Sequence, residues 1–475
     1  MTTGSEKRGP EPRSPVSGAE LLARIENVPF SRWHAKARVV MGSATFFDAY
    51  NALSLAFALP ILIGLWHISP AQVGLLIASS YVGQLVGALL FSGLAERFGR
   101  VPTATIAMAI MSVMNLGCAF AGNFSALLWI RLAQGIGVGG EMPVAAAYIS
   151  ELSRAHGRGR FFLLYELIFP IGLMATGQIA ALVVPPLGWK SMFFIGAIPG
   201  LLITFALTRL PESPRWLISK GRLAEANQIV RQMEAGAAGK IPELVPGQAQ
   251  SSPAQPAFSD TPAGPQPTVV NRTRWTELLS PAYRGRTLVV WALWASAFFV
   301  ANGLNNWMPT LYRTVYHLGL RESLRDASMT NVAQVAILLI CAFSIDRIGR
   351  RNWMVASFIV GGVLLAILGF VGGGSVFSVM LWGTLSYGVI GSVLAVLYLY
   401  TPEIYPTRMR AIGTGMATAW LRIASAVGPA LVGVMVADGG INLVFWMFAG
   451  VSVAGALVAM YMIETRDRKL EEIAP

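Results

Sequence analysis

Charged side chains are scarce in this sequence. They form 13% of its 475 residues, about half the share found in soluble domains, whereas 54% of the residues are hydrophobic and the mean hydropathy is +0.57. Apolar runs long enough to cross a bilayer recur from one end to the other. These features exclude a single large soluble core and indicate a membrane protein that crosses the bilayer many times.

Cysteine and histidine are also rare. The two cysteines, Cys118 and Cys341, fall inside apolar runs, and the four histidines are scattered along the chain. This excludes a disulfide framework and a thiolate metal site, and no pattern of Ser, His and Asp indicates a catalytic triad. We therefore expect a protein that is not an enzyme and that uses no metal or other cofactor. Residues 1–15 hold no apolar run, so we expect no signal peptide.

Windows of about 20 apolar residues predict an all-α membrane protein with twelve transmembrane helices. The predicted spans are 38–65, 71–95, 102–121, 126–149, 161–184, 190–209, 287–311, 327–345, 352–371, 375–400, 410–437 and 441–463. An even number of spans places both termini on the same side of the membrane.

The basic residues are distributed unevenly about these spans. Nearly all Lys and Arg lie in the tails and in the even-numbered connections, whereas the odd-numbered connections hold only Lys190, Arg313, Arg321 and Arg325. The positive-inside rule then predicts that both termini are cytoplasmic. The net charge of +12 is explained by this topology and by attraction to anionic membrane lipid, so we expect no binding to nucleic acid.

The acidic and basic residues that follow spans two, four and six recur after spans eight, ten and twelve. GLAERFGRV (93–101) matches FSIDRIGRR (343–351), and SELSRAHGRGR matches PEIYPTRMR. The third pair is PESPRW and IETRDR. Two six-helix halves in parallel repeat are therefore predicted, with a binding site between them.

This repeat divides the chain into five predicted parts. They are a cytoplasmic tail (1–37), a first six-helix bundle (38–209), a cytoplasmic linker (210–286), a second six-helix bundle (287–463) and a short cytoplasmic tail (464–475). In the linker, RLAEANQIVRQMEA has helical periodicity and is expected on the membrane surface. The Pro-rich part, 241–270, is expected to be disordered, with a regulatory docking role as the alternative to a plain spacer.

Several motifs resemble those of the major facilitator superfamily. GLAERFGRV is similar to the family's G-x-L-A-D-R-x-G-R-[RK] and differs from it at Ser92, Glu96 and Val101, whereas DRIGRR is the nearer match. RLAQGIGVGG (131–140) resembles the R-x-x-Q-G-x-G motif of span four. The resemblance covers nearly the whole chain outside the tails and the linker. It implies a monomeric carrier that works by alternating access.

Other stretches resemble one branch of this superfamily. The Gln-Gln pair that sugar porters carry in span seven is absent from FFVANGLNNWMPTLY, and their G-P-x-x-W is absent from span ten. LAVLYLYTPEIYPTRMRA, GGEMPVA (139–145) and FFDAYNAL instead resemble the bacterial nicotinate and metabolite:proton symporters. Synaptic-vesicle-2-like proteins and the organic anion and cation carriers are related to these. A bacterial inner membrane is the location that this branch implies.

Two charged residues inside the spans are candidates for proton coupling. Asp48 lies about ten residues into span one, and Arg131 lies about five residues into span four from the other face. A matching pair couples protons in the sugar porters, so the resemblance implies that Asp48 takes up and releases a proton as Arg131 approaches and withdraws. The alternative is a static ion pair that only joins the two spans.

Further charged residues are expected near the cytoplasmic face. Glu141 and Glu166 are candidates for a second protonation site or a gate, with hydrogen bonding inside the bundle as the alternative. A larger set is expected to form salt bridges that close a cytoplasmic gate, or else a solvated charged rim. Its members are Glu96, Arg97, Arg100, Glu151, Arg158, Glu212, Asp346, Arg347, Arg350, Glu403 and Arg410.

Arg422 is the candidate substrate anchor. It lies in AWLRIAS of span eleven, where the organic anion carriers and the nicotinate-type symporters have an arginine and the cation carriers have an aspartate. A fixed cation favours a carboxylate substrate through charge and hydrogen bonding, although a backbone carbonyl is an alternative partner. The orienting contacts are assigned to Tyr50, Asn302, Asn305, Asn306 and Trp307, of which Trp307 can instead be an interface anchor.

These observations together predict a secondary active transporter. It imports a small organic anion, for example an aromatic carboxylate such as nicotinate, by symport with protons. Its partners are therefore a small molecule, protons and membrane lipid. A sugar or polyol:proton symporter is the first alternative, and a sensor that binds without transporting is the second.

Overall fold

A computed structural model describes residues 17–29, 31–152, 167–237, 275–371, 375–406, 409–438 and 440–466. The helices of the first half are α2 (Arg32–Trp66), α3 (Pro70–Phe98), α4 (Arg100–Phe120), α5 (Phe124–Glu151), α7 (Ile168–Leu187) and α8 (Lys190–Leu207). The helices of the second half are α11 (Arg284–Thr314), α12 (Leu320–Ile348), α13 (Arg350–Val371), α14 (Val376–Glu403), α15 (Arg410–Asp438) and α16 (Gly440–Ala459). Outside the halves lie α1 (Gly18–Asn27), α9 (Pro214–Ser219), α10 (Leu223–Gly236) and the 3₁₀ turn η1 (Trp275–Leu279).

Eleven helices in the described part of the chain are long and apolar enough to cross a membrane, which confirms the all-α membrane fold. The remaining predicted span, 126–149, forms the 28-residue helix α5, which is not apolar enough to be counted among these eleven. Its hydropathy is lowered by Arg131, Gln134 and Glu141, all of which are buried. α5 nevertheless runs through the first half between α3 and α4.

The predicted repeat is visible in the turns that join the helices. Gly99 between α3 and α4 and Gly349 between α12 and α13 have φ angles of +108° and +91°, a region where side chains other than glycine are strained. Glu212 accepts hydrogen bonds from the backbone N–H groups of Arg100 (3.0 Å) and Val101 (3.2 Å). Glu464 does the same for Arg350 and Arg351, each at 3.0 Å. Each carboxylate thus lies at the N-terminus of a helix, where a negative charge is stabilised.

Glycines allow α3 and α5 to pack with their backbones in contact. A Cβ atom on Gly83 or Gly87 would overlap the backbone carbonyl of Leu132 or Ile136, and a Cβ on Gly139 would overlap the backbone of Gln84. The glycine-rich stretch RLAQGIGVGG of α5 therefore serves close helix packing.

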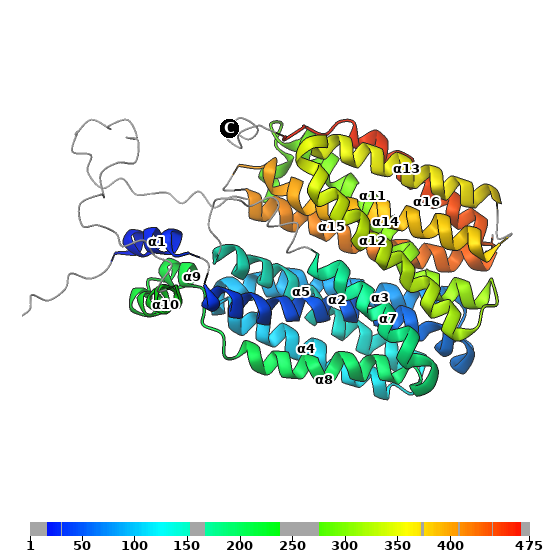
Figure 1. The fold of residues 1–475 in the computed structure, drawn as a ribbon, viewed down its shortest axis with the longest axis horizontal. Helices are drawn as coiled ribbons and strands as arrows, with labels where there is room; N and C mark the ends of the chain where they lie inside the picture. The colour runs from blue at the N-terminus through cyan, green and yellow to red at the C-terminus, as the bar shows by residue number, and fades with distance from the viewer. Residues whose placement is uncertain are drawn as a thin grey trace, which may run out of the picture.

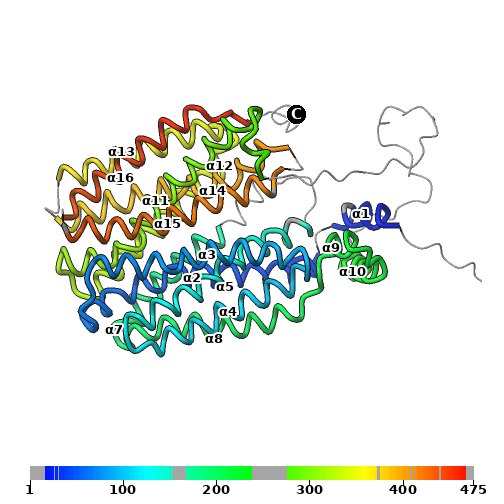
Figure 2. The backbone as a smooth tube through the Cα atoms, turned by 180° about the vertical axis from the view of Figure 1, so that it is seen from behind, coloured from blue at the N-terminus to red at the C-terminus, as the bar shows by residue number. Residues whose placement is uncertain are grey.

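The two halves lie side by side and converge toward one end of the molecule. Figures 1 and 2 show their ribbons separated at the end that carries α1, α9 and α10, which we call the capped end, and close together at the opposite end. Near that opposite end, Gln178 Nε2 of α7 donates to Ser328 Oγ of α12 at 2.9 Å. A Cβ on Gly74 of α3 would also overlap the backbone of Ala430 in α15.

The capped end contains a small helical cluster that the sequence predicted only in part. The helix predicted in the linker is present as α10, but its buried residues Ala226, Val230 and Met233 face protein rather than lipid. They pack with Leu21 and Ile25 of α1, a helix inside the segment that was predicted to be a plain tail. Arg24 of α1 also donates to both carboxylate oxygens of Glu234 in α10, at 2.8 and 2.7 Å.

Helix ends differ from the predicted spans, because helices continue past the apolar windows into their polar flanks. α2 begins at Arg32 rather than at residue 38, and α12 begins at Leu320 rather than at residue 327. The Pro-rich stretch 241–270 lies outside the described residues.

Candidate functional site

A cavity of about 90 Å³ lies between the two halves, large enough for several water molecules or a small ligand. Helices α2, α3, α5 and α7 line it on one side, and α11, α12, α14 and α15 line it on the other. Most of the lining is apolar or aromatic. Its polar members are Asp48, Tyr81, Gln84, Asn302, Asn305, Asn306, Gln334, Tyr387, Tyr398 and Arg422.

Asp48 and Arg422 supply the charges of this cavity. They come from different halves, and each is almost fully buried, with 3% and 5% of its surface exposed. Their charges act on each other. Within the described part of the chain, Asp48 Oδ1 and Arg422 Nε have no hydrogen-bond partner, so both residues keep unused hydrogen-bonding capacity.

The other nitrogens of Arg422 bind backbone carbonyls. Nη1 donates to Thr418 O at 2.9 Å, and Nη2 donates to Gly139 O of the first half at 3.4 Å. The alternative role considered for Arg422, a backbone partner inside the bundle, is therefore present in this conformation. It uses only part of the guanidinium, and the side chain still lines the cavity.

Arg131 does not form the expected ion pair with Asp48. Although both residues are described, no salt bridge joins them, and Arg131 Nη1 instead donates to Gln134 Oε1 at 2.6 Å and to Asn51 O at 3.3 Å. Gln134 in turn donates to Asn115, which donates to Asn51. An arginine side chain is long enough to reach several partners, and here backbone and amide oxygens of the first half are its partners.

Glu141 of α5 lies close to Thr45 of α2, and Thr45 lies one helical turn before Asp48. Its Oε1 accepts a hydrogen bond from Thr45 Oγ1 at 3.3 Å, and its Oε2 is buried without a partner. The charges of Glu141 and Asp48 also act on each other. Two acidic groups with unused oxygen atoms are thus grouped on α2 and α5, whereas Glu166, the other candidate in this set, lies outside the described residues.

The three asparagines predicted on α11 all line the cavity. Asn302 Nδ2 donates to Ser425 Oγ at 2.6 Å, and Asn306 Nδ2 donates to Tyr81 OH across the two halves at 3.2 Å. Asn305 belongs to a larger cluster with Asn331, Tyr387 and Gln334.

Tyr50 and Trp307 are buried but do not line the cavity. The hydroxyl of Tyr50 donates to Met192 O at 2.9 Å, and the indole N–H of Trp307 donates to Pro429 O at 3.0 Å. Both side chains turn toward neighbouring helices of their own half. The sequence did not reveal this, because the position of a residue along a helix does not specify which side of the helix faces the cavity.

Several polar residues of the cavity were not predicted, namely Gln84, Gln334, Tyr81, Tyr387 and Tyr398. Gln84 is 7% exposed, and its Nε2 has no hydrogen-bond partner. The signal that could have revealed Gln84 and Gln334 is an amide side chain inside an apolar run, as in VGQLVG and VAQVAI.

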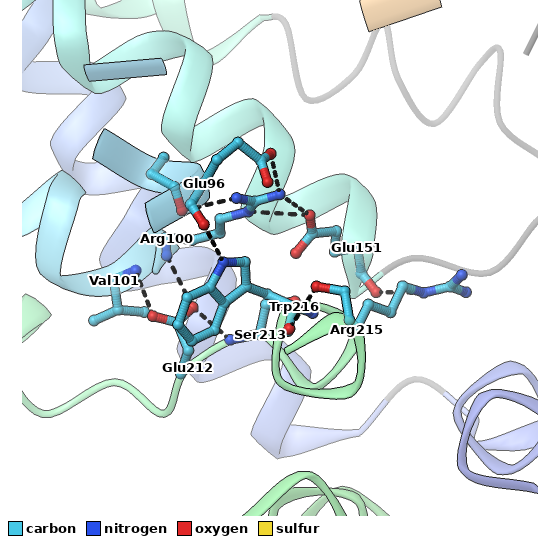
Figure 3. Close-up of polar contacts among 10 residues, drawn as sticks. Glu96, Arg100, Val101, Glu151, Glu212, Ser213, Arg215 and Trp216 are labelled. Carbon is cyan, nitrogen blue, oxygen red and sulfur yellow. Dashed lines mark hydrogen bonds and ion pairs between the residues drawn. The ribbon is translucent and has the colours of Figure 1, made fainter. Parts of the chain in front are cut away.

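The predicted charged set gathers at the capped end, in one cluster for each half. Figure 3 shows the first cluster, in which Arg100 binds Glu96 at 2.8 Å and Glu151 at 2.9 Å. Trp216 Nε1 donates to Glu96 O at 3.2 Å and joins α9 to the same cluster. Burial raises the pKa of Glu212, which lies beside these residues, and the backbone hydrogen bonds that it accepts oppose this rise.

The second cluster repeats the first with Arg350 at its centre. Arg350 binds Asp346 at 3.1 Å and Glu403 at 3.5 Å. Within the described ranges, every ion pair of the two clusters joins residues of the same half, so the clusters form no bridge between the halves in this conformation.

The remaining members of the predicted set make other contacts. Arg410 Nε donates to Tyr405 O at 3.1 Å, and the carbonyl of Arg347 accepts from Arg466. The guanidinium of Arg97 lies 5.3 Å from the centre of the Phe98 ring. Arg158 lies outside the described residues.

Comparisons with known proteins agree with this architecture. The family described as sugar (and other) transporter matches residues 34–475. The niacin transporter NiaP of Acinetobacter baylyi is 32% identical over 96% of this chain and 99% of its own length. The synaptic vesicle 2-related protein of Pongo abelii is 25% identical over 94% of this chain and 81% of its own.

A solved structure has the same fold. The xylose transporter XylE from E. coli, in a partially occluded inward open conformation, superposes with a TM-score of 0.70 at 19% identity and covers 92% of this chain and 100% of its own. The match over nearly the whole sequence, the paired six-helix halves and the cavity between them lead to the same assignment. The chain belongs to the sugar (and other) transporter family and is a membrane transporter of the major facilitator superfamily.

Proposed function

We propose that this protein imports a small organic anion, an aromatic carboxylate such as nicotinate, together with protons. The observation that carries the proposal is the pair Asp48 and Arg422. From opposite halves, these buried residues contribute one acidic and one cationic side chain to the same cavity. The 32% identity to a niacin transporter over nearly the full length supports the choice of substrate. The remaining lining, apolar and aromatic with a few polar groups, suits a small flat ligand.

Charge balance gives a physical reason for the coupling. An ionised Asp48 and Arg422 together are neutral, and a carboxylate that binds Arg422 leaves one negative charge in excess beside two deeply buried side chains. An uncompensated charge in such a place costs several kcal/mol or more. A proton that binds Asp48 restores neutrality, so substrate and proton enter together, and by linkage each promotes binding of the other.

Glu141 provides a route for this proton. It accepts a hydrogen bond from Thr45, which lies one helical turn before Asp48 in α2, and its other oxygen has no partner among the described residues. We assign it to the transfer of protons between Asp48 and the capped end. Arg131 then has a different function from the one that the sequence implied, since it holds the amide network of α2, α4 and α5 together.

The positive-inside rule indicates that the capped end faces the cytoplasm. The contacts of α3 with α15 and of α7 with α12 then close the outer side. The two charged clusters lie on the inner side, where they form the gate when the halves rock the other way. We further propose that α5 is the twelfth span and that the protein acts as a monomer in a bacterial inner membrane.

Uptake into proteoliposomes under an imposed pH gradient, acid outside, tests this function. The panel contains labelled nicotinate, benzoate, short carboxylates, xylose, glucose and choline. We expect accumulation of an aromatic carboxylate that a protonophore abolishes. Binding of a carboxylate without any flux would contradict transport and favour a sensor.

Replacement of Asp48 by asparagine tests the role of the acid. The Asp48→Asn variant should lose accumulation driven by the pH gradient but keep counterflow exchange of the substrate, because exchange needs no net proton movement. Asp326→Asn is the matched control, since Asp326 is also buried but pairs with Arg325 (2.9 Å) and does not line the cavity. If Asp48→Asn lost both accumulation and exchange while Asp326→Asn kept both, the coupling role of Asp48 would be contradicted.

A sugar or polyol:proton symporter is the second candidate. The uncharged amide and hydroxyl groups of Asn305, Asn306, Gln334 and Tyr387 favour it, because such groups bind sugar hydroxyls. Accumulation of xylose or glucose without any carboxylate would establish this alternative and leave Arg422 with a structural function.

A further inference from the structure

Four neutral polar side chains form a connected cluster at the second-half wall of the cavity. Asn305 and Asn331 form a reciprocal pair in which each side-chain amide donates to the oxygen of the other at 3.2 Å. Asn305 Nδ2 also donates to Tyr387 OH at 2.9 Å, and Tyr387 OH donates to Gln334 Oε1 at 3.1 Å. All four side chains are buried.

The hydrogen-bond inventory gives this chain of contacts a direction. The reciprocal pair uses one N–H of Asn305, so its other N–H points to Tyr387. The hydroxyl of Tyr387 accepts there, and its single proton has two acceptors within reach, Asn331 Oδ1 at 3.4 Å and Gln334 Oε1 at 3.1 Å. The shorter contact assigns this proton to Gln334. Gln334 therefore has its oxygen occupied and its NH₂ group turned away from Tyr387.

The NH₂ group of Gln334 is left almost without a protein partner. Among the described residues, its only hydrogen-bond acceptor is Gly391 O at 3.5 Å, too long for a strong hydrogen bond. Gln334 lines the cavity and is only 2% exposed, so the N–H that does not point to Gly391 O is a buried donor, which costs about 1–3 kcal/mol unless a ligand satisfies it. The amide thus has an orientation fixed by Tyr387 and a donor available to a bound molecule.

Gly391 provides the space that this arrangement requires. A Cβ atom at this position would come within 2.8 Å of Gln334 Cγ and 2.9 Å of its Nε2. An alanine there would push the amide out of its place without removing it.

We propose that Gln334 determines which carboxylates are transported. It does so by donating a hydrogen bond to a second acceptor atom of the substrate, one that lies apart from the carboxylate group. The substrate class is then an aromatic carboxylate with a ring acceptor, such as a pyridine nitrogen. Arg422 binds the carboxylate, and Tyr387 is a positioning residue that acts through Gln334. The inference rests on the proposed function, since it concerns selectivity within the same cavity.

Nicotinate and benzoate are the probes, because they differ only in the ring nitrogen. The wild-type protein should transport nicotinate with a KM about ten to a hundred times lower than that for benzoate, the range expected for one buried hydrogen bond. In Gln334→Leu this preference should disappear through a higher KM for nicotinate, with the KM for benzoate unchanged or lower. Continued uptake of benzoate would also show that the variant is folded.

Two further variants separate positioning from folding. Tyr387→Phe and Gly391→Ala should each reduce the preference for nicotinate by about tenfold with little change in the uptake of benzoate, because the donor remains but is no longer held in place. Tyr312→Phe is the matched control, since the hydroxyl of Tyr312 is also buried but has no partner and does not line the cavity. It should leave the preference unchanged.

The outcomes distinguish this inference from the function on which it rests. Uptake of neither carboxylate by the wild-type protein would overturn both. Uptake of both carboxylates, with the same preference in the wild type, Gln334→Leu, Tyr387→Phe and Gly391→Ala, would overturn the inference alone. A wild-type protein that does not prefer nicotinate to benzoate would also overturn it.

Discussion

At the scale of single residues, the two buried arginines have different surroundings, and these surroundings are the reason for proposing different functions for them. Arg131 is bound by the amide oxygen of Gln134 and the backbone of Asn51 within one half. Arg422 reaches from the other half into the cavity that Asp48 also lines, and the two charges attract each other, although no salt bridge joins these two described residues. The acid at Asp48 is therefore associated with the arginine of α15 rather than with that of α5.

A double-mutant cycle tests this assignment. Asp48→Asn and Arg422→Gln should show an interaction free energy of about 1 kcal/mol or more in the free energy of unfolding, because each residue loses the charge that the other balances. Asp48→Asn and Arg131→Gln should be additive within about 0.5 kcal/mol. Denaturant unfolding of the purified protein in a mild detergent gives both values, and the reverse ranking would restore the pair that the sequence implied.

The sequence identified the charged residues of the site but not their partners. Asp48, Arg131, Glu141 and Arg422 stand out because a charge inside an apolar run is costly. Which of them meet depends on the rotation of α2, α5 and α15 about their axes, and hydropathy does not specify that rotation. For the same reason Tyr50 and Trp307 were expected in the cavity, whereas Gln334 was not.

At the scale of the helices, the contact of α3 with α5 requires particular glycines. A Cβ at Gly83 would overlap the carbonyl of Leu132, whereas a Cβ at Gly93 of the same helix would meet nothing within 4 Å. Backbone overlap cannot be relieved by a change of rotamer, so the helices would have to move apart.

The variants Gly83→Ala and Gly93→Ala should consequently have opposite effects. Gly83→Ala should lower the thermal unfolding midpoint markedly, at a cost of about 1–3 kcal/mol or more, because it overpacks the interface. Gly93→Ala should be neutral or stabilising by up to about 1 kcal/mol, because alanine is the better helix former. Thermal melting in detergent measures both, and equal effects would show that α3 and α5 are not in such close contact.

Helix prediction succeeded where apolar runs are long and failed where a helix needs a partner. The spans were found from hydropathy, and α10 was found from its periodicity. α1 was missed because ten residues form a stable helix only when their apolar side is covered, and the covering helices α9 and α10 are about 200 residues away in the sequence.

At the scale of the whole molecule, the halves are in contact near the end opposite the capped end. The ion pairs of the two charged clusters at the capped end join residues of the same half. The sequence predicted the two halves from their repeated motifs. It did not predict the conformation, because the same motifs are compatible with every state of a carrier that rocks between two openings.

Chemical cross-linking tests this rocking motion. With Cys118 and Cys341 replaced, the pair Gln178→Cys and Ser328→Cys should be linked by a short bifunctional methanethiosulfonate, which attaches through reducible disulfides, because these side chains are in contact. The link should stop uptake, and reduction should restore it. The pair Glu96→Cys and Asp346→Cys, one in each charged cluster, provides the comparison and should not be cross-linked in the same state. Uptake that continues after complete cross-linking at 178 and 328 would contradict a motion that separates the halves there.

The central claim, that an anion and a proton enter the same cavity together, is tested most directly by proton uptake on substrate binding. Nicotinate is added to the purified protein in weakly buffered solution, and the pH change is followed alongside binding. The account predicts that the wild-type protein takes up protons as the anion binds and that Asp48→Asn binds the anion without taking them up. Binding with no proton uptake by the wild type, or equal uptake by Asp48→Asn, would contradict it.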